Sequence, residues 1–111
     1  MRTKSDIQQK SFLNGDMILR FLTEKKGELQ KRFHIKDIGL FGSYSRGDFN
    51  EESDIDIVYV LQDGEKFGYF EYLELDEMLS GSFNNKRVEL VNYKYMNPII
   101  KQKAEKEILY V

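Results

Sequence analysis

The alternation of hydrophobic and polar positions along the 111-residue chain changes period several times, and each change predicts a new element. Apolar residues recur three and four positions apart over residues 16–33, which predicts an amphipathic helix, broken or kinked near Gly27. Residues 35–41, 54–61 and 87–91 are short, apolar and rich in β-branched side chains, which is typical of strands.

Helices are predicted at residues 44–46 (a single turn), at 67–79, and from Pro98, since Asn97 and Pro98 form a favourable helix start. The last helix carries Ile100, Ala104 and Ile108 four positions apart on one face, and residues 80–86 form a polar loop. Helices and strands alternate along the chain. This order indicates an α+β fold with a small mixed β-sheet flanked by helices.

Composition narrows the class of protein. Hydrophobic residues make up 41% of the chain and charged residues 32%, which is ordinary for a globular domain. The net charge of −2 provides no bulk attraction to nucleic acid or anionic lipid, and cysteine is absent. With no long apolar run, we expect a cytoplasmic protein without a membrane segment or direct nucleic-acid binding. Residues 1–12 are expected to be a flexible lead-in, and residues 13–111 a single domain.

The first candidate ligand-binding residues along the chain are Gly42 and Ser43, which follow the first predicted strand and end it. Glycine lets the backbone approach a ligand, and the N–H groups of the following helical turn favour a phosphate. Ser43 is a suitable N-cap for that turn, and Gly47 is a suitable end. This segment therefore predicts a phosphate-binding turn.

Asp54 and Asp56 open the second predicted strand, two positions apart, so their side chains project from the same face. At about 5 Å and an effective dielectric near 20, their repulsion is roughly 3 kcal/mol, which a bound cation would remove. Glu89 can add a third carboxylate if the strand at 87–91 lies beside the second. Three carboxylates suit Mg²⁺, and two ions about 4 Å apart could clamp an in-line displacement. The predicted substrate is a metal-bound nucleoside triphosphate.

Gly42-Ser43, ten residues, and then Asp54-Ile55-Asp56 resemble the GS-x10-DxD signature of the DNA polymerase β-like nucleotidyltransferase superfamily. The extended stretch LFGSYSRGDFNEESDIDIVYV resembles the minimal nucleotidyltransferases (MNT) of prokaryotes. The resemblance implies a polymerase β-like core and an antitoxin paired with a HEPN-domain ribonuclease toxin. Such an antitoxin uses ATP and Mg²⁺ to transfer AMP onto a tyrosine of the toxin, with which it forms a hetero-oligomer.

The resemblance also assigns roles to residues. Asp54 and Asp56 match the paired metal ligands, and Gly42 and Ser43 match the residues that hold the nucleotide phosphates. Glu89 falls where the family usually has an aspartate that helps to deprotonate the acceptor hydroxyl. Its side chain is one methylene longer than aspartate, which allows coordination but affects placement of the acceptor.

Two further positions match the family pattern, Arg46 and Ser53, and both are assigned to nucleotide binding. Arg46 could contact phosphate or brace the acidic loop through Asp48 or Glu51, and we favour the bracing interpretation.

Two alternatives remain open at this point. The acceptor could be a small molecule or an RNA end, although the chain has no basic groove for RNA and no added helical domain like that of larger relatives. Alternatively, the protein could be a non-catalytic antitoxin that sequesters its partner, which the glutamate at position 89 favours. The aromatic cluster Phe67, Tyr69, Phe70 and Tyr72 cannot all face inward on one helix, and part of it is a candidate partner-binding patch.

Overall fold

The computed structural model describes residues 13–111, so the predicted lead-in at residues 1–12 lies outside the described residues. The first element of the described residues is helix α2 (Gly15–Phe33). Its first turn is capped by the Asn14 side chain, which accepts a hydrogen bond from the Met17 N–H. The helix runs through Gly27 without the predicted break. Leu22 and Leu29, fully buried on either side of Gly27, keep the helix against the core and outweigh the glycine's entropic cost.

A four-stranded sheet with the order β3-β2-β1-β4 forms the centre of the molecule. Strands β1 (Ile35–Phe41) and β2 (Ile55–Leu61) are antiparallel, and β2 pairs in parallel with β3 (Val88–Asn92). The predicted small mixed sheet and its three strands are therefore confirmed. The fourth strand, β4 (Leu109–Tyr110), pairs antiparallel with β1 and was not predicted, because two residues carry no readable period.

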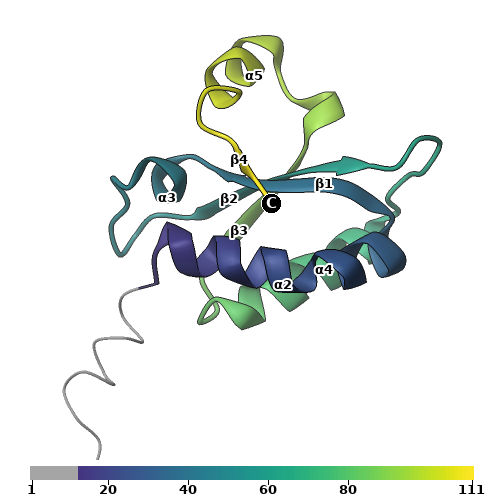
Figure 1. Cartoon of the computed structure of the whole chain (residues 1–111), viewed down its shortest axis with the longest axis horizontal. Helices are drawn as coiled ribbons and strands as arrows, with labels where there is room; N and C mark the ends of the chain where they lie inside the picture. Colours follow the sequence, from purple (N-terminus) through teal and green to yellow (C-terminus); the bar gives the residue numbers. More distant parts are fainter. Residues whose placement is uncertain (1–12) are drawn as a thin grey trace, which may run out of the picture.

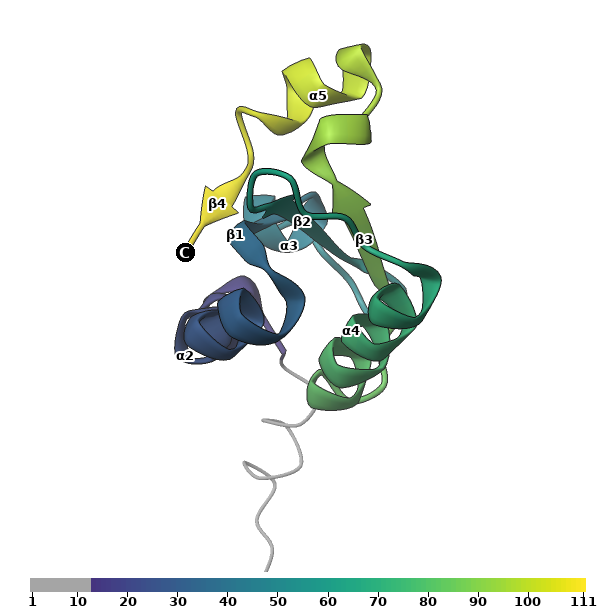
Figure 2. The same cartoon turned by 90° about the vertical axis from the view of Figure 1, so that its right-hand side faces the viewer.

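The two faces of the sheet are covered differently (Figures 1 and 2). Helices α2 and α4 (Tyr69–Ser82) lie side by side against one face, where they enclose the main core. The short 3-10 helix η1 (Tyr93–Tyr95) and helix α5 (Pro98–Ala104) lie over the other face. A single turn, α3 (Ser43–Arg46), follows β1 at one end of the sheet.

Successive side chains of β2 point alternately to the two faces of the sheet. Ile55, Ile57 and Tyr59 are buried in the main core beneath the sheet, whereas Val58 belongs to a smaller cluster with Met96 and Ala104. Asp56 shares the parity of Val58. The acidic side chains therefore project on the thinly covered face, away from α2 and α4.

Two helix boundaries differ from the prediction. Helix α4 continues to Ser82, three residues into the predicted loop, because Leu79 and Phe83 are buried and the Phe83 N–H bonds back to the Leu79 carbonyl. Helix α5 ends at Ala104, and Ile100 is exposed instead of sharing a buried stripe with Ala104. Among the helices of residues 13–111, none is long and apolar enough to cross a membrane.

Candidate active site

The predicted motif residues meet at the end of the sheet where β1 finishes and β2 and β3 begin. In the β-ladder Asp56 is the Cα partner of Phe41 on one side and of Glu89 on the other. Gly42 follows Phe41 directly and starts the turn into α3. The structure thus places Gly42, Asp56 and Glu89 across three neighbouring strands.

Gly42 touches the carboxylate of Asp56. Its backbone has φ +76° and ψ −152°, a region that is essentially restricted to glycine. A Cβ built at this position would lie 2.2 Å from Asp56 Oδ2, which is closer than atoms can approach. The two halves of the motif are therefore in direct contact, and only a residue without a side chain permits this contact.

Asp56 and Glu89 form a carboxylate pair. Partial burial, a hydrogen bond with Glu89 and the negative charges of Glu89 and Asp54 together raise the pKa of Asp56 to about 6. Arg46 opposes this shift with a smaller effect. Below about pH 6 the pair therefore holds a proton, and a cation bound to the two carboxylates would replace it.

Asp54 does not complete a three-carboxylate group. It lies just before the first residue of β2, and its Oδ2 is 3.9 Å from Arg87 Nη1. Within residues 13–111, no three acidic or histidine side chains lie close enough together to hold one metal ion. The predicted cleft is thus formed only in part: Asp56 and Glu89 lie side by side on neighbouring strands, and Asp54 lies outside the strand, beside Arg87. Asp56 and Glu89 supply hard oxygen donors that fit Mg²⁺, and the metal roles of all three acids stay predictions.

The turn after Gly42 has a different cap from the predicted one. Gly42, not Ser43, occupies the N-cap position of α3, and its carbonyl accepts from the N–H groups of Ser45 and Arg46. Ser43 is the first helical residue, and its carbonyl accepts from the N–H of Gly47, which ends the turn in a left-handed conformation as predicted. Gly42 takes the cap because its φ and ψ angles point its carbonyl along the turn, towards the N–H groups of Ser45 and Arg46.

Arg46 braces the turn through two carboxylates. Its Nε donates to Asp48 Oδ2 at 3.0 Å and its Nη1 donates to Glu107 Oε2 at 3.0 Å. These contacts agree with the favoured bracing interpretation through Asp48. The hydrogen bond with Asp48 raises the pKa of Arg46, and the same bond lowers the pKa of Asp48. Any contact of Arg46 with a nucleotide stays a prediction.

Ser53 closes the acidic loop that precedes β2. Its Oγ accepts from the Asn50 N–H at 2.9 Å, and its own N–H donates to the Asn50 carbonyl. Lys86 holds the same loop from the start of β3 by donating to the carbonyls of Glu51 and Ser53 at 2.7 and 3.0 Å. These bonds describe Ser53 as a loop-closing residue, and its predicted nucleotide contact is untested.

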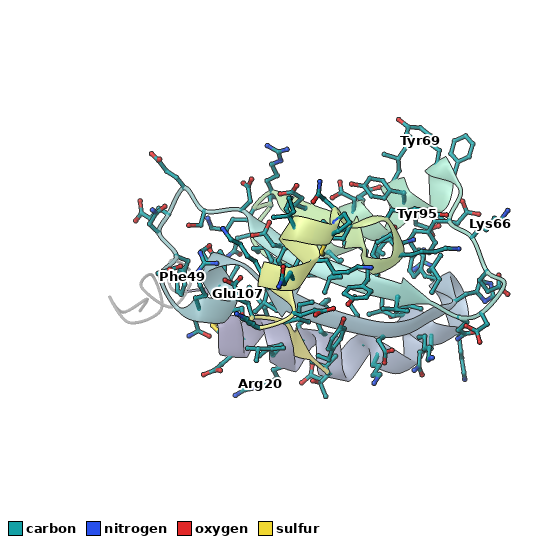
Figure 3. The ribbon with its side chains drawn as sticks, turned by 90° about the horizontal axis from the view of Figure 1, so that it is seen from above. Arg20, Phe49, Lys66, Tyr69, Tyr95 and Glu107 are labelled. Carbon is teal, nitrogen blue, oxygen red and sulfur yellow. The ribbon has the colours of Figure 1, made fainter. Side chains whose placement is uncertain are left out.

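Sequence reasoning missed three residues at this end of the sheet: Lys86, Arg87 and Glu107. Each acts over a long sequence distance, and an isolated charged residue gives no signal of its partner. Figure 3 shows Glu107 and Phe49 near the same end of the molecule, while Tyr69, Tyr95 and Lys66 lie at the opposite end. The contacts that were not predicted therefore lie at the end of the sheet that carries Gly42, Asp56 and Glu89, which we call the motif end.

Two cavities flank the sheet. One of about 510 Å³ runs along β3 and α4 and includes Glu89, Arg87 and Asp76 in its lining. The other, of about 680 Å³, lies at the opposite end, with Tyr69, Tyr95 and Phe67 in its lining. The first includes Glu89 but not Asp56 in its lining, and the rest of its lining comes from β3, from α4 and from the segment between them.

Comparison with known proteins identifies the class. A family model described as a nucleotidyltransferase domain matches residues 22–111. The protein adenylyltransferase MntA of Thermococcus cleftensis is 36% identical over 102 residues, which covers 91% of this chain and 99% of the relative. The chain belongs to the nucleotidyltransferase family, and it has the enzymatic core of that family. Its fold matches that of a solved minimal nucleotidyltransferase with a TM-score of 0.69 at 24% identity, covering 89% of this chain and 97% of that chain.

Solved structures show the same architecture. A crystal structure of a toxin–antitoxin with AMP-PNP matches with a TM-score of 0.63 at 25% identity, covering 78% of this chain and 69% of that chain. A tri-AMPylated Shewanella oneidensis HEPN toxin in complex with an MNT antitoxin gives a TM-score of 0.57 at 21% identity, covering 83% and 70%. The second likeness supports the fold alone.

Proposed function

We propose that this protein is an antitoxin that transfers AMP from ATP to a tyrosine hydroxyl of a HEPN-domain toxin, with Mg²⁺ as cofactor. The observation that carries the proposal is the Asp56 carboxylate, held between Gly42 and Glu89. It joins a predicted phosphate-holding turn to a predicted metal-binding pair within one ladder of the sheet. The adenylyltransferase and toxin–antitoxin relatives support the donor and the type of partner.

In the proposed reaction, the tyrosine oxygen forms a bond to the α-phosphorus of ATP, and the bond from that phosphorus to pyrophosphate breaks. Glu89 accepts the hydroxyl proton, and pyrophosphate leaves with the electrons of the broken bond. Gly42 and Ser43 orient the phosphates, while Asp54, Asp56 and Glu89 would hold Mg²⁺. The ion would supply charge neutralisation at the phosphates, and a second ion is proposed on the same carboxylates.

The acceptor would be presented by the partner protein. The side chain of Glu89 is exposed to solvent, so an acceptor hydroxyl can reach it from outside the chain. We place the reaction in the cytoplasm, where ATP is abundant. A small molecule or an RNA end is a less favoured acceptor, since the relatives named for an activity modify protein.

The test is transfer of label from α-³²P-ATP to a purified HEPN partner in the presence of MgCl₂. We expect labelling of the partner by the wild-type chain, loss of labelling with EDTA, and loss with the Asp54→Ala/Asp56→Ala variant. Mapping by mass spectrometry should find AMP on a tyrosine. No transfer by the wild type, or equal transfer by the double variant, would refute the proposal.

A second candidate function is neutralisation by sequestration without catalysis. It is favoured by one observation: no three carboxylates within residues 13–111 gather around a single point. The two functions differ in cells that express the toxin. A catalytic antitoxin loses protection with Asp56→Ala, whereas a sequestering antitoxin still protects.

A further inference from the structure

The chain passes beside the Gly42–Arg46 turn a second time, through a segment more than sixty residues further on. Strand β4 pairs with β1 so that Tyr110 faces Gly39 and Leu109 faces Leu40. Continuing this antiparallel register by two residues brings Glu107 next to Gly42. In Figure 3, Glu107 accordingly lies at the motif end of the molecule.

Glu107 holds the turn with two acceptor groups. Its carboxylate accepts from Arg46 Nη1 at 3.0 Å, and its main-chain carbonyl accepts from the Ser45 hydroxyl. Ser45 and Arg46 are also the two residues whose N–H groups bond to the Gly42 carbonyl. A single residue therefore contacts both of the residues that close the turn onto the Gly42 carbonyl.

Main-chain hydrogen bonds hold the segment around Glu107 on both sides, so this segment can hold the Gly42–Arg46 turn in place. The N–H groups of Glu107 and Ile108 donate to the Ala104 carbonyl at 2.8 and 2.9 Å. On the far side, the Val111 N–H donates to the Ile38 carbonyl at 3.1 Å. Gly39 permits this close approach, since a Cβ there would lie 2.9 Å from the Leu109 carbonyl oxygen.

The ion pairs of Arg46 distinguish Glu107 from the other carboxylate that contacts it. Arg46 lies between two carboxylates, those of Asp48 and Glu107, and it also acts on the charge of Asp56. Asp48 is exposed and belongs to the turn's own loop, whereas Glu107 is less exposed and belongs to the anchored segment. Glu107 is thus the partner that ties Arg46 to the rest of the fold.

We infer that Glu107 is a positioning residue for nucleotide binding: through Arg46 and Ser45 it holds the Gly42–Arg46 turn in the geometry that receives the nucleotide phosphates. This inference rests on the proposed nucleotidyl transfer. It assigns to the segment between α5 and β4 a role in substrate affinity, separate from the carboxylates that carry the chemistry.

The experiment compares Glu107→Gln with Glu105→Gln, a control two residues away whose carboxylate accepts from the Tyr93 hydroxyl instead of from the turn. Binding of Mg·AMP-PNP is measured by calorimetry, and kcat and KM for ATP are measured with the HEPN partner. Glu107→Gln should raise Kd and KM about five-fold with kcat within about two-fold, the scale of one partly exposed ion pair. Glu105→Gln should leave all three unchanged.

Two further variants show whether Glu107 acts through the turn. Arg46→Gln/Glu107→Gln should bind no more weakly than Arg46→Gln alone. Ser45→Ala, which removes only the contact to the carbonyl, should raise Kd in the same direction by a smaller factor and keeps the test available if Glu107→Gln unfolds.

The outcomes separate this inference from the proposed function. A wild-type chain that binds Mg·AMP-PNP but labels no partner contradicts the proposed transfer, while the Kd comparison still decides the role of Glu107. Equal Kd values for the wild type and Glu107→Gln overturn the inference, as do equal losses in the Glu107→Gln and Glu105→Gln variants. A wild-type chain that binds no nucleotide overturns both.

Discussion

The two faces of the sheet differ in what they bury. On the face covered by α2 and α4, long aliphatic and aromatic side chains such as Leu22, Phe33 and Leu75 are almost fully buried in one continuous cluster. On the other face, the buried cluster within residues 13–111 consists of Val58, Met96 and Ala104, and Asp56 projects beside it. One face supplies stability, and the thinner cover of the other leaves room for charged groups and a substrate. Variants on the two faces should therefore separate stability from activity.

The largest effect is expected on the thickly covered face. Leu75 is fully buried in α4, so Leu75→Ala should lower the free energy of unfolding by about 2–5 kcal/mol, through lost burial and a residual cavity. Met96→Ala on the other face should cost about 2 kcal/mol or less, because a thin cover collapses more easily around the gap. Urea unfolding followed by circular dichroism measures both. Equal losses would show that the faces contribute equally.

The next effect is a loss of activity without a loss of stability. Glu89→Gln keeps the shape of the side chain but removes its ability to accept a proton, so kcat should fall about 100-fold. Melting temperature should stay within a degree or two of the wild type, since Glu89 is exposed. Glu89→Asp is the matched control, and it should retain kcat within about ten-fold of the wild type. A fully active Glu89→Gln variant would exclude Glu89 as the base.

Gly42→Ala should affect both properties. The new Cβ collides with Asp56 Oδ2, and the backbone conformation is strained for any L-residue, at a cost of about 1–3 kcal/mol. Transfer activity should drop at least ten-fold, because Asp56 must move. Gly47→Ala is the control: it also has a positive φ, but its added Cβ meets nothing within 4 Å. We expect Gly47→Ala to lose stability and keep activity, and equal activities of the two variants would argue against the contact.

The smallest effect is a pH dependence of the apo protein. The pKa of Asp56 is raised to about 6 from an ordinary value near 4, so the folded state binds the proton more tightly than the unfolded state. Its contribution to stability is complete below about pH 4 and is lost as the pH rises through about 6. The wild type should therefore lose stability relative to Asp56→Asn across this interval. Melting temperatures of the two proteins between pH 4 and 7.5 measure this difference, and parallel curves would contradict the shift.

Removal of the proton from the pair should also strengthen metal binding. Stabilisation of the wild type by MgCl₂ should be larger at pH 7.5 than at pH 5, because protons and Mg²⁺ compete for the carboxylates of Asp56 and Glu89. The Asp56→Asn variant should show little dependence of this stabilisation on pH.

The strands and the motif could be predicted from sequence because their signals are local. The sequence predicted that Asp54, Asp56 and Glu89 would share a cleft if the strand at 87–91 lay beside the second strand. The parallel pairing of β2 with β3 meets that condition and places Asp56 beside Glu89, whereas no group of three acids forms within residues 13–111. Strand β4 could not be predicted because its two residues carry no readable period, and the contacts of Glu107 and Lys86 could not be predicted because a single charged residue carries no local signal of its partner. The cap of α3 was assigned to Ser43 because serine is a common cap, whereas the backbone angles of Gly42 decide it.

The contact between Gly42 and Asp56 restricts which substitutions the site can accept during evolution. A side chain at position 42 has room only if position 56 is shortened, although the positive φ still strains it, and shortening position 56 removes the carboxylate that the proposed site needs. Each change is harmful alone, and the pair together gives an inactive protein, so the two positions are mutationally epistatic. In a deep mutational library selected for the proposed antitoxin activity, position 42 should accept almost nothing but glycine. In a library selected for folding alone, substitutions at 42 should appear mainly alongside small residues at 56.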